Sequence, residues 1–273
     1  MYESYWHLRQ KPFENGADRR FYYPSESHQA ALLKLRYAIE NRRGAALLTG
    51  PSGSGKTLIV QMLRQMLGEE YSPLVHLVFP QMTPAELLAY LADELAGPDG
   101  EEGVPPVSHS VRRIERFLAD NTEQGLHAVL AVDEAHLLDD GRTLEALRLL
   151  SNFESGGRAG LTLLLCGQVG LLPVLDRKPH FEERLAVKCL IRPLTLDETA
   201  AYVRHRLEVA GATQPIFSDD APAALQRLTH GNVRQINRLC DLALLIGYAE
   251  ERSTLDAEHL EAVCQELLHV VPE

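Results

Sequence analysis

The sequence predicts an α/β protein with a three-layer αβα domain, built on a central parallel five-stranded sheet, and a C-terminal four-helix domain. Three observations support this prediction. Short, almost unbroken apolar runs alternate with helical periodicity through the first two thirds of the chain, as in a parallel sheet covered by helices on both faces. A glycine-rich loop follows the first apolar run. After Pro193 the strand-like runs stop, and only helical periodicity continues.

Five apolar runs give the expected strands. These runs are Gly44–Thr49, Pro73–Phe79, His127–Val132, Leu161–Cys166 and Ala186–Ile191. The segments around them repeat apolar residues at helical spacing. The expected helices are His28–Asn41, Gly55–Leu67, Pro84–Ala96, Ser108–Glu123 and Thr143–Phe153. Thr83 and Glu86 fit a capping box before the third of these helices.

The last part of the chain predicts the four-helix domain. Its expected helices are Thr195–Ala210, Ser218–Thr229, Asn232–Glu250 and Thr254–Leu268. Thr195, Ser218 and Thr254 are expected to cap three of them. The domain boundaries are therefore set at 1–193 and 194–273. The segment 1–27, rich in aromatic residues, is expected to pack on the αβα domain.

Composition and charge limit the classes of function and the cellular compartment that we expect. The 273 residues carry a net charge of −11, which does not favour a dedicated DNA-binding domain, because such domains usually present a basic face. The four cysteines lie among apolar neighbours without CxxC spacing, as buried thiols do in a reducing compartment. The N-terminus lacks the pattern of a signal peptide, and no apolar run is long enough to span a bilayer. We therefore expect a cytoplasmic protein.

The glycine-rich loop carries the strongest functional signal. Its sequence, GPSGSGKT, fits the pattern GxxxxGK[ST] and lies between an expected strand and an expected helix. Glycines let the backbone wrap a phosphate chain, and the helix N-terminus directs its N–H groups at the anion. Lys56 is expected on the β- and γ-phosphates and the Thr57 hydroxyl on Mg²⁺. The expected nucleotide-binding residues are Gly50, Pro51, Ser52, Gly53, Ser54, Gly55, Lys56, Thr57 and Leu58.

Acidic and polar residues end the next strands on the same edge of the predicted sheet. Asp133 follows the run His127–Val132 and is expected to bind Mg²⁺ directly or through its water shell. Glu134 is expected to polarise the attacking water, which favours hydrolysis over binding alone. Gln168 lies where it could contact the γ-phosphate or that water; the alternative is that it opens a turn.

These motifs, in this order, resemble the AAA+ ATPases, and among them the ExeA-type (GspA-like) ATPases of general secretion. Related groups are the exosortase-associated ATPases and the TniB- and MuB-type transposition ATPases. The matching segments cover nearly the whole chain and include Tyr2–Trp6, Tyr23–His28, Val132–His136, Cys166–Gln168, Leu194–Thr199 and Gly231–Cys240.

The resemblance implies further roles. Arg234 resembles the sensor arginine that contacts the γ-phosphate from the helical lid; the alternative is a solvated helix residue. Arg184 is similar to the arginine finger that completes a neighbour's site, with Arg177 as the second choice; either could instead be a surface charge. Tyr23 and His28 are expected near the adenine, and the alternative for both is core packing.

The leading hypothesis is an ATPase that uses ATP and Mg²⁺, assembles as a homo-oligomeric ring or filament, and acts on an unidentified protein client. Two alternatives stay open: a DNA-associated scaffold of the TniB or MuB type, and a nucleotide switch with little turnover. ExeA-type secretion ATPases often continue into a membrane span and a peptidoglycan-binding domain. Neither follows in this sequence, which puts a cell-wall role in doubt unless the sequence is a fragment of a longer chain.

Overall fold

The computed structural model describes residues 1–16, 18–100, 103–138 and 141–269. The chain divides into two compact units. An α/β unit comprises Ser27–Ser52 and Lys56–Ile191, and a helical unit comprises Met1–Glu26, Gly53–Gly55 and Arg192–Glu273. Each unit is described by itself below.

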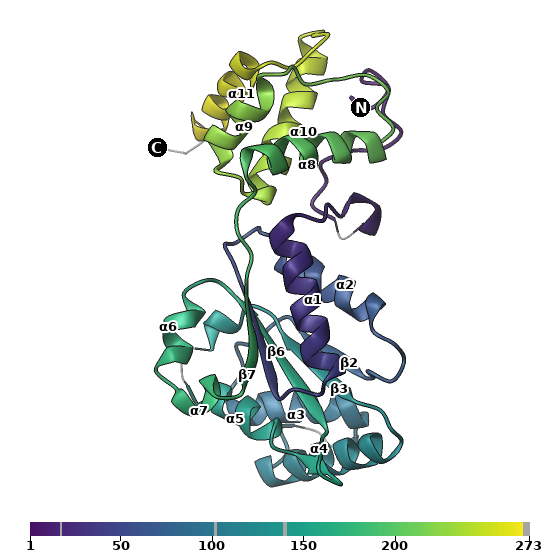
Figure 1. Ribbon diagram of the computed structural model, residues 1–273, viewed down its shortest axis with the longest axis vertical. Helices are drawn as coiled ribbons and strands as arrows, with labels where there is room; N and C mark the ends of the chain where they lie inside the picture. Colours follow the sequence, from purple (N-terminus) through teal and green to yellow (C-terminus); the bar gives the residue numbers. More distant parts are fainter. Residues whose placement is uncertain (17, 101–102, 139–140, 270–273) are drawn as a thin grey trace. The chain divides into compact units, whose positions relative to one another are not determined.

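A parallel five-stranded sheet with the order β2-β3-β6-β1-β7 forms the centre of the α/β unit (Figure 1). Its strands are β1 (Ala45–Thr49), β2 (Leu74–Leu77), β3 (Ala128–Val132), β6 (Leu161–Gly167) and β7 (Leu185–Leu190). Every residue of β1, β3 and β6 is buried, which explains their unbroken apolar sequences. This arrangement confirms the predicted fold class.

Helices cover both faces of this sheet. The main ones are α1 (Glu26–Glu40), α2 (Lys56–Met66), α3 (Pro84–Ala96), α4 (Val107–Glu123) and α5 (Arg142–Leu150). Alternate strand residues such as Leu47, Leu130 and Leu163 share one core cluster with leucines and isoleucine of α3, α4 and α5. The residues between them point to the opposite face, where Figure 1 shows α1 and α2.

Short elements that the sequence did not predict occur between the longer ones. They are the 3₁₀ turns η1 (Arg19–Phe21) and η2 (Ala135–Leu137), the two-residue strands β4 (Glu154–Ser155) and β5 (Arg158–Ala159), and the helices α6 (Leu171–Asp176) and α7 (Pro179–Glu182). Of these, η2 matters for the site, because it directly follows Glu134.

The helical unit consists of four helices and the N-terminal segment. The helices are α8 (Leu196–Val209), α9 (Ala221–Thr229), α10 (Val233–Ala249) and α11 (Ala257–His269). Thr195 caps α8 in a capping box with Glu198, as predicted. The other two predicted caps are wrong. Helix α9 begins only after Asp220, and Asp256, not Thr254, accepts a hydrogen bond from the N–H group of His259 at 2.8 Å.

The N-terminal segment belongs to the core of the helical unit, which corrects the expectation that residues 1–27 pack on the αβα domain. Tyr2, Trp6 and Phe13 are buried in the same cluster as the leucines of α8 to α11. The indole Nε1 of Trp6 donates to the carbonyl of Leu244 at 2.9 Å. Aromatic composition predicts that a segment is buried, but it does not say against which partner.

Arg206 of α8 fixes the rest of this segment. Its guanidinium group is buried, lies 4.5 Å from the centre of the Phe21 ring, and donates to the carbonyl of Glu14 at 2.8 Å and to that of Pro12. A buried charge is tolerated when its donors are satisfied in this way. The N-terminal segment is therefore a structural part of the helical unit.

Candidate nucleotide site

The glycine-rich loop connects the end of β1 to the start of α2, as its sequence predicts. Gly53 and Gly55 adopt φ values of 75° and 90°, a region that residues with a Cβ atom rarely occupy. Lys56 and Thr57 form the first turn of α2. The unpaired N–H groups and the positive end of the helix dipole make this turn a suitable place for an anion.

Lys56 is held by the loop that precedes it. Its residue is buried, and its Nζ atom donates to the carbonyl oxygens of Gly50 at 3.1 Å and Pro51 at 2.9 Å. The ammonium group is thereby fixed against the loop.

Thr57 and Asp133 meet at the edge of the sheet. The Thr57 hydroxyl donates to Oδ2 of Asp133 at 2.7 Å, although 76 residues separate them. Burial opposes ionisation of this carboxyl group, but the nearby His76 imidazole and the hydrogen bonds from the Thr57 hydroxyl and the backbone N–H of Glu134 outweigh it and lower the pKa of Asp133. Asp133 is therefore an anion at neutral pH in a site of low exposure.

The donor atoms at this point suit Mg²⁺. A hydroxyl oxygen and a carboxylate oxygen, both hard ligands, lie side by side. Across the described ranges, no cluster of three or more His, Cys, Asp or Glu side chains could hold a metal by itself. In nucleotide sites Mg²⁺ is usually bound through one or two protein oxygen ligands, with phosphate oxygens and water completing its shell.

Glu134 lies beyond the end of β3 in an unusual backbone conformation. Its φ and ψ angles are 49° and 34°, and a left-handed conformation costs a residue with a Cβ atom about 1–2 kcal/mol. The surrounding structure stabilises this turn, since the Glu134 N–H donates to Oδ1 of Asp133 at 2.9 Å and Leu137 donates back to the Glu134 carbonyl at 2.9 Å. The Glu134 side chain is about half exposed.

Two histidines beside these acids were not predicted as site residues. His76 of β2 places Nε2 3.6 Å from Oδ2 of Asp133. His136 places Nδ1 3.3 Å from Oε2 of Glu134. A polar residue within the apolar strand β2 was the available signal for His76. For His136 the signal was its position two residues after Glu134, but the contact depends on the left-handed turn.

Gln168 directly follows β6, at the same edge of the sheet as Asp133. Its backbone N–H lies 3.4 Å from Nδ1 of His136. Gly167 allows this approach, because a Cβ atom there would lie 3.1 Å from the backbone nitrogen of His136. The ends of β3 and β6 are thus in direct contact. No described contact involves the side-chain amide of Gln168, and its contact with phosphate stays a prediction.

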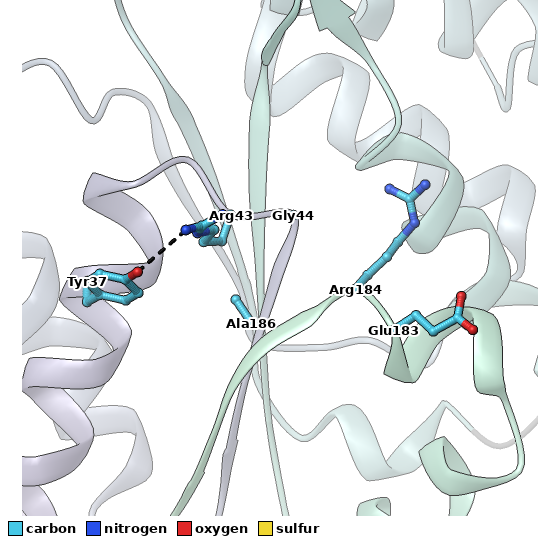
Figure 2. A pocket seen from close by; sticks show the side chains of 6 residues that line it. All are labelled: Tyr37, Arg43, Gly44, Glu183, Arg184 and Ala186. Carbon is cyan, nitrogen blue, oxygen red and sulfur yellow. Dashed lines mark hydrogen bonds between the residues drawn. The ribbon is translucent and has the colours of Figure 1, made fainter.

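Arg184 lies away from this edge, just before β7. It lines a hollow of about 430 Å³ together with Tyr37, Arg43, Gly44, Glu183 and Ala186. Figure 2 shows the Arg184 guanidinium extending away from the neighbouring side chains, whereas Arg43 is directed at Tyr37. Arg177 is exposed at the end of α6. Among the described residues, no ion pair is recorded for either Arg184 or Arg177.

Arg234 occupies the first turn of α10 in the helical unit, after the cap Asn232. Its backbone N–H donates to the carbonyl of Gly53 at 3.3 Å, and Gly53 is grouped with this unit. A Cβ atom on Gly53 would lie 2.6 Å from the Cβ of Arg234. The residue predicted to sense phosphate is therefore next to a glycine of the phosphate loop.

The two residues expected near adenine belong to different units. Tyr23 is in the helical unit, where its ring contacts those of Tyr202 and His205 at centroid distances of 5.9 and 6.0 Å. His28 is buried on α1 of the α/β unit. Their contact with the base stays a prediction.

The fold and the phosphate loop define a class, the nucleotide-binding AAA+ ATPases, and comparisons with known proteins agree. The sequence profile of the AAA domain family matches residues 39–175. The chain belongs to this family. It is also 37% identical over 253 residues to General secretion pathway protein A of Aeromonas hydrophila. That alignment covers 91% of this chain but 45% of the relative, so the chain spans less than half of its length.

Solved structures show the same fold at low sequence identity. The ORC2 protein of Aeropyrum pernix has a TM-score of 0.67 at 14% identity, covering 94% of this chain and 71% of that one. Cdc6p of Pyrobaculum aerophilum has a TM-score of 0.67 at 16% identity, covering 96% and 74%. The RuvB branch migration motor of Thermotoga maritima has a TM-score of 0.60 at 16% identity, covering 89% and 69%. These similarities support the predicted fold.

Proposed function

We propose that the protein binds Mg–ATP and hydrolyses it. The observation that carries this proposal is the contact of 2.7 Å between Thr57 Oγ1 and Asp133 Oδ2, with Glu134 next in sequence. This contact brings together a helix N-terminus for phosphate, oxygen ligands for Mg²⁺ and, next in sequence, a carboxylate on a half-exposed side chain for water. A binding module needs the first two of these features but not the third.

The residues divide the work as phosphoryl transfer requires, mainly by positioning and by electrostatic stabilisation. Lys56 would neutralise charge on the β- and γ-phosphates, and bound Mg²⁺ would add to that neutralisation. Glu134 would orient the attacking water and accept its proton. Gln168 and Arg234 would contact the γ-phosphate. Membership of the family and the geometry of the loop support these roles.

We propose that assembly of several copies completes the site. The support is Arg184, whose guanidinium lines an open hollow without an ion pair among the described residues. An arginine finger raises the rate of phosphoryl transfer by about 10³–10⁵-fold in nucleoside triphosphatases. Turnover per chain would then depend on protein concentration. Arg177, the second choice for the finger, is the residue against which Arg184 is compared in the experiment below.

The similarity to General secretion pathway protein A supports a secretion-related protein client. Free cysteines, three of them buried, suit a reducing compartment such as the cytoplasm. None of the helices in the described ranges is long and apolar enough to cross a membrane. For the DNA-scaffold alternative, the net charge of −11 is unfavourable, and a gel shift at low salt with ATP tests it directly.

Phosphate release from Mg–ATP tests the proposal. Glu134→Gln should lower kcat by about 10²–10⁴-fold, the contribution of a general base, while binding of a fluorescent ATP analogue persists. Glu154→Gln, an exposed acid on β4, is the matched control and should keep the wild-type rate. An undiminished rate in Glu134→Gln would refute the role of Glu134. No release by the wild type at any concentration would favour the switch alternative.

A concentration series tests the assembly. Turnover per chain should rise with concentration for the wild type and for Arg177→Ala, and Arg184→Ala should remove the rise. If Arg177→Ala removes it instead, Arg177 is the finger. Turnover independent of concentration in all three proteins would mean that each chain acts alone.

A further inference from the structure

The Nδ1 atom of His136 lies between the residues that follow strands β3 and β6. Nδ1 of His136 lies 3.3 Å from Oε2 of Glu134 and 3.4 Å from the backbone nitrogen of Gln168. These two neighbours make opposite demands. The carboxylate oxygen needs a proton on Nδ1, whereas the N–H of Gln168 needs an unprotonated Nδ1 that accepts. His136 can therefore satisfy only one of them at a time.

The protonation of Nδ1 affects both the Glu134 carboxylate and the end of β6, because both lie close to His136. Oε2 of Glu134 is buried and has no hydrogen-bond partner within the described residues, and Nδ1 of His136 lies 3.3 Å from it. The close approach of Gly167 to the His136 backbone leaves no room for an intervening side chain. A shift at the end of β6 therefore reaches the imidazole directly.

We propose that His136 is a positioning residue that couples the end of β6 to the carboxylate of Glu134. When Nδ1 carries the proton, it holds the carboxylate and the contact with Gln168 is lost. When Nδ1 accepts from the N–H of Gln168, its lone pair repels Oε2, and the carboxylate turns to water. This inference rests on the proposed hydrolysis and on the proposed contact between Gln168 and the γ-phosphate. That contact would favour the arrangement in which Nδ1 accepts from the N–H of Gln168.

A double-mutant cycle between His136 and Glu134 tests the coupling. His136→Leu removes both hydrogen-bonding options. His136→Asn keeps them, because the amide can present either its oxygen or its NH₂ group at the Nδ1 position. The matched control is His109→Leu, which removes a histidine of α4 that contacts Asp99. Phosphate release, affinity for a fluorescent ATP analogue and thermal unfolding are measured for each protein.

The expected result is a kcat for His136→Leu lowered by about 10–100-fold, by analogy with the loss of residues that orient metal ligands. Nucleotide affinity and the unfolding temperature should stay at wild-type values, and His136→Asn should recover most of the rate. In the Glu134→Gln background, His136→Leu should cause no further loss, because its effect passes through Glu134.

Three outcomes would overturn the inference while leaving the proposed ATPase intact. One is a wild-type kcat in His136→Leu. Another is an equal loss with and without Glu134, which would mean that His136 acts independently. The third is a loss of rate that accompanies weaker nucleotide binding or a lower unfolding temperature and is not recovered by His136→Asn, as for a structural residue. If the wild type itself releases no phosphate, the proposed function fails, and the inference falls with it.

Discussion

Acidification should destabilise the α/β unit through one buried histidine. His127, just before β3, is fully buried, with Nδ1 3.2 Å from the carbonyl of Ala159 and Nε2 2.8 Å from the hydroxyl of Thr162. Burial and, second, the charge of Arg42 lower the pKa of His127 from 6.5 to about 4, against a smaller opposing effect of the Ala159 carbonyl. The ring is therefore neutral in the folded protein at pH values where it is charged in the unfolded chain.

The sign and the size of the effect follow from proton linkage. Above pH 6.5 the ring is neutral in both states, and its contribution is complete. Between pH 6.5 and about 4 the unfolded chain binds a proton that the folded chain does not, so the free energy of unfolding falls. One pH unit corresponds to about 1.36 kcal/mol, so the total loss is about 3 kcal/mol. Below pH 4 this group adds nothing more.

Urea unfolding followed by circular dichroism from pH 7 to pH 4 measures this loss. The comparison protein is His127→Gln, which keeps hydrogen-bonding capacity but does not titrate in this range. Other groups contribute equally to both proteins, so the stability difference between them isolates His127. We expect the advantage of the wild type to shrink by most of 3 kcal/mol as the pH falls. A difference that stays constant with pH would refute the reasoning.

Three further predictions concern the two units. Thr57→Val should raise the Mg²⁺ concentration needed for half-maximal phosphate release by at least about 10-fold, whereas Thr57→Ser, which keeps the hydroxyl, should not; equal requirements would exclude Thr57 as a ligand. Gly247→Ala should lower the free energy of unfolding by about 1–3 kcal/mol, because its Cβ would lie 2.5 Å from Leu255; urea titration followed by the fluorescence of Trp6 measures this, and an unchanged midpoint would contradict it. Arg206→Met should lower the free energy of unfolding by about 1–3 kcal/mol, because the carbonyls of Pro12 and Glu14 lose their donor, and should free the N-terminal segment for proteolysis; resistance equal to the wild type would show that the segment is held by its aromatic residues alone.

The sequence was informative where local pattern and tertiary environment agree. The strands β1, β3 and β6 were predictable because both of their faces are buried, so that every position is apolar. Thr195 was predictable as a cap because Glu198 completes the box. The caps predicted at Ser218 and Thr254 were wrong, because an aspartate nearer to each helix, Asp220 or Asp256, marks its start. The hairpin of β4 and β5 is too short to show a periodicity.

The site was predictable to the extent that its residues lie in contiguous motifs or at strand ends. Asp133 could be placed beside Thr57 because the ends of parallel strands share one edge of a sheet. The contact of His136 with Glu134 could not, since it requires the left-handed turn at Glu134. The partner of the N-terminal segment was not predictable either, because its aromatic composition indicates burial but not the surface against which the segment packs.

The N-terminal segment has a consequence for how the chain is made. The helical unit takes residues from both ends of the sequence, Met1–Glu26 and Arg192–Glu273, so the α/β unit is topologically an insertion within it. During synthesis the first 26 residues must wait for roughly 165 further residues before their partner helices emerge, a delay on the order of 10 s at typical rates of translation. Trp6 and its aromatic neighbours are exposed throughout that time. A chaperone that recognises short aromatic segments would therefore find its substrate at the beginning of this chain, and expression of the C-terminal helices alone would give a unit without part of its core.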